Sequence, residues 1–182
     1  MKVRDIMDII HNIDDNVLNF VQEHFKNSFM DTIMPVITSL GNRGIVWILI
    51  TIVLIAVKRY RKYGYMLALA LIITLVVGNL TLKPLIARTR PFDANDLKSI
   101  LLIEAPTDYS FPSGHTMSSF AAAIVLIYMD KKVGIIAMIL AVLIAFSRLY
   151  LYVHYPSDVF AGMILGILSA IISIKLLSKI KV

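Results

Sequence analysis

The sequence contains no cysteine among its 182 residues. Disulfide bonds and thiolate chemistry are therefore excluded, although the absence says nothing about the cellular compartment. Charged residues are scarce as well, because they make up 16% of the chain, whereas hydrophobic residues make up 58%. Soluble domains have an apolar content nearer ~45–50%. The composition therefore indicates a membrane protein.

Signals for export and for nucleic-acid binding are also lacking. Residues 1–27 carry charges throughout and contain no apolar stretch of the kind found in a cleavable signal peptide. The net charge of +6 comes from lysines and arginines that lie mainly in short loops between apolar runs. Basic residues in such loops set the orientation of a membrane protein, so we expect no nucleic-acid partner.

Apolar runs predict an all-α fold, a polytopic transmembrane helix bundle with about five spanning helices. The runs cover residues 44–57, 65–82, 117–129, 133–146 and 159–177. A span needs ~20 residues, so the shorter runs must include polar flanking residues that lie at the level of the lipid headgroups. None of the runs shows the alternation that is typical of a strand.

Residues 1–40 differ from the rest of the chain. Apolar residues recur there at helical spacing among several acids, which predicts an amphipathic helix with breaks near residues 27–28 and after Pro35. We expect this segment to lie on the membrane surface or to pack against the bundle. The predicted division is an N-terminal interfacial segment, 1–40, followed by one transmembrane domain, 41–182.

The basic loops predict the orientation of the bundle. Two basic hairpins, 58–62 and 130–132, and the C-terminal lysines fall on one face when the helices are counted. The positive-inside rule makes this the cytoplasmic face. The polar motifs described next then lie on the opposite face, outside the cytoplasm.

The stretch 147–158, between the last two apolar runs, contains Arg148, His154 and Asp158. Such residues are costly near hydrocarbon, so a functional site is the default hypothesis. Pro156 suits the first turn of a helix, which places His154 just before that helix and Asp158 one turn inside it. The carboxylate can accept from one imidazole nitrogen and leave the other free to attack. The guanidinium of Arg148 suits an oxyanion such as phosphate.

Two further segments supply positive charge and a helix N-terminus. Lys83 and Arg90 lie on the same predicted face, where cations would repel one another without an anion. Ser113 and Gly114 precede a helix that begins near His115. Free backbone N–H groups at such a helix end bind anions. The segments together predict a phosphate site.

Taken in order, the three segments read Lys-x6-Arg-Pro, Pro-Ser-Gly-His and Ser-Arg-x5-His-x3-Asp. With these motifs complete, the chain resembles the type 2 phosphatidic acid phosphatase family of integral-membrane lipid phosphatases, over roughly residues 41–177. The resemblance implies a set of phosphate-binding residues, which are Lys83, Arg90, Ser113, Gly114 and Arg148. It also implies that His154 forms a phosphohistidine. Asp158 would orient that histidine, and His115 would act first as acid and then as base.

Two-step transfer of this kind requires no metal and no other cofactor. The chain agrees with this expectation, because it has four histidines and lacks the clustered carboxylates that Mg²⁺ usually recruits. Arg88 lies outside the motif pattern, so we expect it to be a surface or headgroup contact. The connection 83–111 is long, and we expect a functional loop or a lid over the site.

The predicted function is removal of a terminal phosphate from a membrane lipid. Undecaprenyl diphosphate is the favoured substrate, and phosphatidylglycerophosphate and phosphatidic acid are the alternatives. The partners are then this lipid phosphate and the bilayer, with the active site on the extracytoplasmic side of the plasma membrane. The oligomeric state stays open.

Three rival functions share parts of the pattern. Vanadate-dependent haloperoxidases carry the same motifs, but they are soluble. A proton- or anion-coupled transporter would place charges near mid-membrane or in paired broken helices, whereas here they collect at helix ends. A lipid-binding protein without turnover would not need intact His115, His154 and Asp158.

Overall fold

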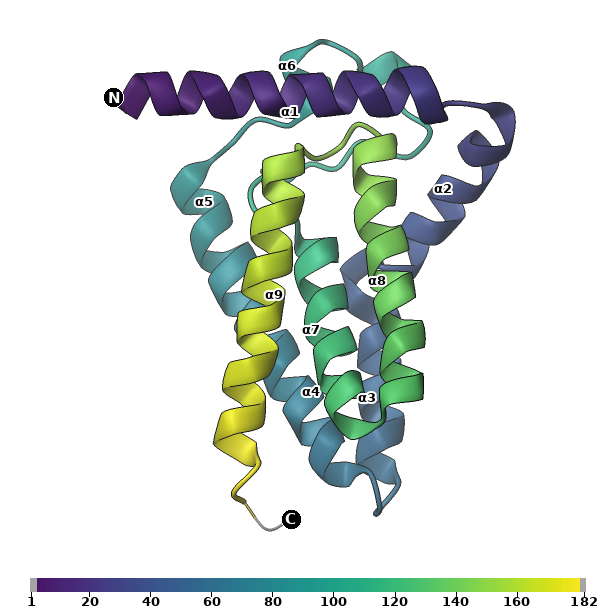
Figure 1. Cartoon of the computed structure of the whole chain (residues 1–182), viewed down its shortest axis with the longest axis vertical. Helices are drawn as coiled ribbons and strands as arrows, with labels where there is room; N and C mark the ends of the chain where they lie inside the picture. Colours follow the sequence, from purple (N-terminus) through teal and green to yellow (C-terminus); the bar gives the residue numbers. More distant parts are fainter. Residues whose placement is uncertain (1–2, 181–182) are drawn as a thin grey trace.

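Residues 3–180 are described by the computed structural model, apart from the side chains of residues 3, 4 and 100. All regular elements within this range are helices. In chain order they are α1 (Val3–Phe25), α2 (Ser28–Leu40), η1 (Asn42–Gly44), α3 (Ile45–Ala56), α4 (Arg61–Thr74), η2 (Leu75–Leu82), α5 (Lys83–Ile86), α6 (Pro91–Ala94), η3 (Lys98–Ile100), α7 (Gly114–Met129), α8 (Lys131–Tyr150) and α9 (Pro156–Leu177). The long helices stand side by side as a bundle, and α1 lies across one end of it (Figure 1).

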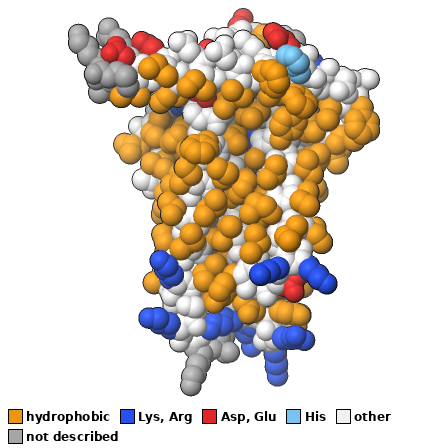
Figure 2. Space-filling model, in the orientation of Figure 1, with side chains coloured by type: hydrophobic (Ala, Val, Ile, Leu, Met, Phe, Trp, Pro, Cys, Tyr) orange, Lys and Arg blue, Asp and Glu red, His pale blue; other side chains and the backbone are white. Residues whose placement is uncertain are grey.

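The predicted all-α transmembrane bundle is confirmed. Four segments are long and apolar enough to cross a membrane, and they are Ser28–Ala56, Arg61–Ala94, Lys131–Tyr150 and Pro156–Leu177. Helix α7 is a shorter apolar helix of the same bundle. Hydrophobic side chains cover the middle of the face shown in Figure 2, as expected for a surface in contact with lipid tails.

The first span starts earlier than the apolar run at residue 44. Helix α2 continues through Pro35 to its end at Leu40, so the predicted break after Pro35 is wrong. The interruption comes at Arg43 and Gly44, whose φ angles of 51° and 67° cannot continue a right-handed helix. The predicted division at residue 41 stays a prediction, although α2 extends the first span back into the N-terminal segment.

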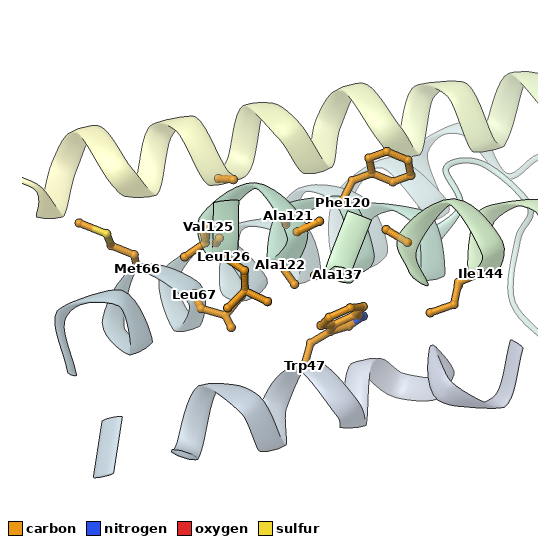
Figure 3. Close-up of a cluster of buried hydrophobic side chains, with 14 of the residues drawn as sticks. Trp47, Met66, Leu67, Phe120, Ala121, Ala122, Val125, Leu126, Ala137 and Ile144 are labelled. Atoms are coloured by element: carbon orange, nitrogen blue, oxygen red, sulfur yellow. The ribbon is translucent and has the colours of Figure 1, made fainter. Parts of the chain in front are cut away.

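Helix α7 lies in the centre of the bundle, where it contacts α4, α8 and α9. Gly166 of α9 approaches α7 so closely that a Cβ atom there would lie 2.4 Å from the backbone oxygen of Met117. Small residues permit such close packing of helices in membranes. Larger side chains, including Trp47 and Ile144, fill the remaining core (Figure 3). This packing holds the N-terminal ends of α7 and α9 beside each other.

Helix α1 packs against the ends of α8 and α9. Its buried side chains are Asp14, Leu18 and Val21, whose spacing places them on one face of the helix. The expected packing of the N-terminal segment against the bundle is therefore observed. In Figure 2 the lysine and arginine side chains gather at the opposite end of the bundle from α1.

Candidate active site

The three predicted motifs meet at the end of the bundle that α1 covers (Figure 1). This end contains the N-termini of α7 and α9, the C-terminus of α8 and the chain around α5 and α6. Hydrogen bonds link the motifs directly, and two of them involve His154 and Asp158. Arg90 Nη1 lies 3.2 Å from His154 Nε2, and the backbone N–H of Ser113 donates to the carbonyl of Asp158 at 3.1 Å.

His154 and Asp158 are both buried, and His154 Nδ1 lies 3.5 Å from Asp158 Oδ2. The same carboxylate oxygen accepts from Ser110 Oγ at 2.5 Å and from the backbone N–H of Tyr155 at 2.9 Å. The Tyr155 contact belongs to the N-terminal cap of α9, so the start of this helix fixes the carboxylate. The arrangement turns Nδ1 of the imidazole toward the carboxylate and Nε2 toward Arg90.

The environment of His154 favours its neutral form. Burial lowers the pKa of His154 well below its ordinary value, and the positive charges of Arg90, Arg148 and Lys83 lower it further. A neutral imidazole keeps a lone pair on one ring nitrogen. With Nδ1 facing Asp158, this lone pair lies on Nε2, beside the cationic side chains.

Arg90 is the most extensively bonded of these cations. Its Nη1 donates to the carbonyl of Val153 at 2.6 Å, and its Nε donates to the carbonyl of Asp108 at 2.8 Å. Its Nη2 donates to Asp108 Oδ1 at 2.6 Å. These bonds hold the planar guanidinium against the segment that carries His154.

Lys83 reaches the same loop carboxylate. Its Nζ forms an ion pair with Asp108 Oδ2 and donates to the carbonyl of Tyr109 at 2.8 Å. Burial alone would raise the pKa of Asp108, but the hydrogen bonds and charges of Lys83 and Arg90 lower it to about 2. The Asp108 side chain is nevertheless 57% exposed. An exposed anion therefore bridges two of the predicted phosphate-binding cations.

Arg148 is buried at the end of α8, and its Nη1 donates to Thr38 Oγ1 of α2 at 2.6 Å. Among the described residues, Arg148 Nε is the buried side-chain nitrogen or oxygen without a hydrogen-bond partner. Buried donors are normally bonded to protein, water or ligand. This free N–H is consistent with the predicted binding of an oxyanion.

The Pro-Ser-Gly-His motif forms the start of α7. Ser113 is its N-cap and accepts from the backbone N–H of Thr116 at 3.4 Å. A Cβ atom on Gly114 would lie 2.9 Å from Asn79 Oδ1, so only glycine fits there without displacing that side chain. His115 follows, and its Nε2 lies 2.9 Å from Asn42 Oδ1.

The expectation for Arg88 is wrong, because this residue belongs to the site. Its Nη1 donates to Asp158 Oδ1 at 2.7 Å, and its Nη2 donates to Asp14 Oδ2 at 2.7 Å. Its guanidinium also lies 3.9 Å from the ring centre of Tyr155. The chain turns sharply at Ala87, which has a φ of 49° at the end of α5. Sequence spacing does not reveal the direction in which Arg88 leaves such a turn.

The motifs did not identify several other residues of the site, which are Asp14, Thr38, Asn42, Asp108 and Ser110. Asp14 had a usable signal, because it shares a helical face with Leu18 and Val21 and was thus an acid on a buried face. The connection that follows α5 also contains α6 and η3. It contributes contacts to the site, and its movement as a lid stays a prediction.

The fold and the site define a class of protein, a helical membrane protein in which cationic side chains and a histidine beside a buried carboxylate lie together at one end of the bundle. The profile of the PAP2 superfamily matches residues 59–181. The chain therefore belongs to the PAP2 superfamily, as the resemblance to type 2 phosphatidic acid phosphatases predicted, and it is a membrane lipid phosphatase.

Three relatives illustrate the range of the match. An undecaprenyl-diphosphatase of Sulfolobus acidocaldarius is 38% identical over 161 residues, which is 88% of this chain and 75% of that protein. The undecaprenyl-diphosphatase BcrC of Bacillus subtilis is 32% identical over 142 residues, or 78% of this chain and 72% of that protein. The crystal structure of a transmembrane PAP2-type phosphatidylglycerolphosphate phosphatase from B. subtilis superposes with a TM-score of 0.77 at 26% identity, over 95% of this chain and 88% of that one.

Proposed function

We propose that this lipid phosphatase removes the terminal phosphate of undecaprenyl diphosphate through a phosphohistidine on His154. The observation that carries the proposal is the position of this imidazole, which has Asp158 beside Nδ1 and Arg90 Nη1 3.2 Å from Nε2. A phosphate bound to the guanidinium would bring its phosphorus next to the lone pair of Nε2, which Arg90 Nη1 faces in this structure. Proximity of this kind supplies much of the rate enhancement in phosphoryl transfer.

In the first step, Nε2 of His154 forms a bond to the terminal phosphorus while the bond from phosphorus to the bridging oxygen breaks. His115 donates a proton to that oxygen, and undecaprenyl phosphate leaves. In the second step, His115 takes a proton from a water molecule whose oxygen attacks the phosphorus. The P–N bond then breaks, which releases inorganic phosphate and restores free His154. Asp158 stabilises the positive charge that develops on the imidazole.

The cations have the complementary role. Lys83, Arg90 and Arg148 would hold the phosphate oxygens, together with the backbone N–H groups at the start of α7 near Ser113 and Gly114. Charge that develops on these oxygens during transfer strengthens such contacts, so part of the binding energy would appear only in the transition state.

The choice of substrate is supported by the names of the two undecaprenyl-diphosphatase relatives. It also fits the position of the site, because a phosphate at the end of an apolar bundle leaves a lipid tail within the bilayer. Phosphatidylglycerophosphate is the second candidate, because the superposed B. subtilis enzyme acts on it by title. The lysines and arginines at the opposite end of the bundle support an extracytoplasmic site.

The decisive experiment measures phosphate release by the purified, detergent-solubilised protein in excess EDTA. The substrates are undecaprenyl diphosphate, phosphatidylglycerophosphate and phosphatidic acid, and the His154→Ala variant is assayed in parallel. We expect the first lipid to be cleaved fastest and the variant to be inactive. Faster cleavage of another lipid would overturn the substrate proposal. A strict Mg²⁺ requirement or an active variant would overturn the mechanism.

A further inference from the structure

We infer that Arg88 and Asp14 are positioning residues for the reaction, and that helix α1 is therefore part of the catalytic apparatus. This inference rests on the proposed function, because it concerns the carboxylate that orients His154. The observation behind it is a buried ion-pair network that connects α1 through Arg88 to the start of α9. Asp14 lies outside the three motifs, and Arg88 occupies an unspecified position of Lys-x6-Arg-Pro.

The members of the ion-pair network are joined by short hydrogen bonds. Arg88 joins Asp158 Oδ1 through Nη1 and Asp14 Oδ2 through Nη2, each at 2.7 Å. Asp14 also accepts from the backbone N–H of Ser157 at 2.8 Å and from Ser157 Oγ at 2.6 Å. The side chains of Asp14 and Asp158 are 1% and 0% exposed, and that of Arg88 is 16% exposed. The contacts are thus largely shielded from water.

Each oxygen of Asp158 has separate partners. Oδ2 faces His154, Ser110 and the backbone N–H of Tyr155, whereas Oδ1 receives Arg88 Nη1. A buried carboxylate without a countercharge is strongly disfavoured in its ionised form. Arg88 supplies this countercharge and also fixes the rotation of the carboxylate, which presents Oδ2 to the imidazole.

Asp14 has the matching role for Arg88. A guanidinium has several donors in one plane, and Asp14 holds the end of that plane that does not contact Asp158. The ring of Tyr155 covers the guanidinium at 3.9 Å, a distance suited to a cation–π contact. Since Asp14 also binds Ser157, one carboxylate from α1 fixes both the arginine and the first turn of α9.

Single-turnover phosphate release, with protein in excess over undecaprenyl diphosphate, tests this inference. At saturating protein, a partly misfolded variant keeps its rate constant, because its folded fraction still exceeds the substrate, whereas a variant with a misplaced catalytic group has a lower rate constant. We expect Arg88→Gln to lower the rate constant about 10- to 100-fold, as losses of supporting residues around an active group commonly do. Arg88→Lys keeps the charge but not the planar fork, and should recover part of the loss.

Asp14, the residue of the ion-pair network that α1 contributes, has its own test. Asp14→Asn should lower the rate constant by several-fold, and Asp8→Asn, an exposed acid of the same helix, serves as its control and should equal the wild type. Because part of the effect of Asp14 passes through Arg88, the double variant Asp14→Asn/Arg88→Gln should lose less than the product of the two single losses. If Arg88→Gln fails to fold, the comparison of Asp14→Asn with Asp8→Asn decides the question.

An unchanged rate constant in Arg88→Gln at saturating protein would overturn the inference. The His154→Ala protein separates this outcome from failure of the proposed function. An inactive His154→Ala beside a normal Arg88→Gln would refute only the positioning role. An active His154→Ala would refute the proposed mechanism, and the positioning role with it.

Discussion

Two carboxylates of the site differ in how firmly they are held: Asp158 lies beside Nδ1 of His154, and Asp108 binds the arginine that lies beside Nε2. Asp158 is fully buried and is bonded to Ser110, Tyr155 and Arg88. Asp108 is 57% exposed, on a loop between α6 and α7, and is bonded to Lys83 and Arg90. Asp158 is fixed by the fold, whereas Asp108 occupies donors that a phosphate would also need under the proposed function. Under the proposed function, burial distinguishes a permanent partner of the nucleophile from an anion that the substrate phosphate would displace.

Two arginines close in the sequence, Arg88 and Arg90, bind these two carboxylates separately. Arg88 and Arg90 are separated by one residue, yet Arg88 binds Asp14 and Asp158, whereas Arg90 binds Asp108 and lies beside His154 Nε2. Extended chain places alternate residues on the same side, but the turn at Ala87 and the start of α6 at Pro91 separate the two side chains. Under the proposed function, Arg88 would therefore support the nucleophile, and Arg90, with the same guanidinium group, would bind the substrate.

Asp158→Asn alters the firmly held carboxylate, and we expect it to lower activity more than the two substitutions described next. Removal of the acid from a hydrolytic triad lowers kcat ~10⁴-fold, because the histidine loses its orientation and its countercharge. We expect a loss on the order of 10³- to 10⁴-fold here, measured as kcat for lipid phosphate hydrolysis. Asp93→Asn, which alters an acid paired with Lys98, is the control. Activity within tenfold of the wild type would show that Asp158 does not orient the nucleophile.

Arg90→Lys tests the arginine that binds the exposed carboxylate of Asp108. Lysine keeps the positive charge but cannot reproduce the bonds that Arg90 makes to Val153, Asp108 and the region of His154 Nε2. We expect kcat/KM to fall roughly 100-fold, as after the loss of one preorganised donor to a developing oxyanion. Arg59→Lys, at an exposed position of the basic hairpin, is the matched control. An equal effect in both variants would contradict the role assigned to Arg90.

Asp108→Asn should have the smallest effect, and in the opposite direction. Loss of the competing carboxylate frees Lys83 and Arg90, so KM for the lipid phosphate and the inhibition constant for vanadate should both fall about threefold to tenfold. Because the pKa of Asp108 is about 2, its carboxylate is ionised throughout the range from pH ~5 to ~8. The gain should therefore be independent of pH across that range. A rise in KM would instead make Asp108 part of the binding site.

Hydropathy and motif spacing determined much of the fold and of the site. Apolar runs of sufficient length require helices in a bilayer, because backbone polar groups must be bonded within the segment. The three motifs placed His154 before a helix, Asp158 in its first turn and Ser113 at a helix start, and each of these positions is observed. Such features depend on residues close in the sequence, so local spacing is sufficient to predict them.

Tertiary structure alone decided the remaining contacts. Asp14 and Arg88 are 74 positions apart, and Arg148 meets Thr38 across 110 positions. Nothing in the spacing of such distant residues indicates which of them will meet, because their contact depends on how α1 crosses the bundle and how α2 packs on α8. The sequence by itself therefore determined the spans and the catalytic motifs. The packing of whole helices determined which charges would pair around His154, because each buried charge requires a partner that only the assembled bundle can provide.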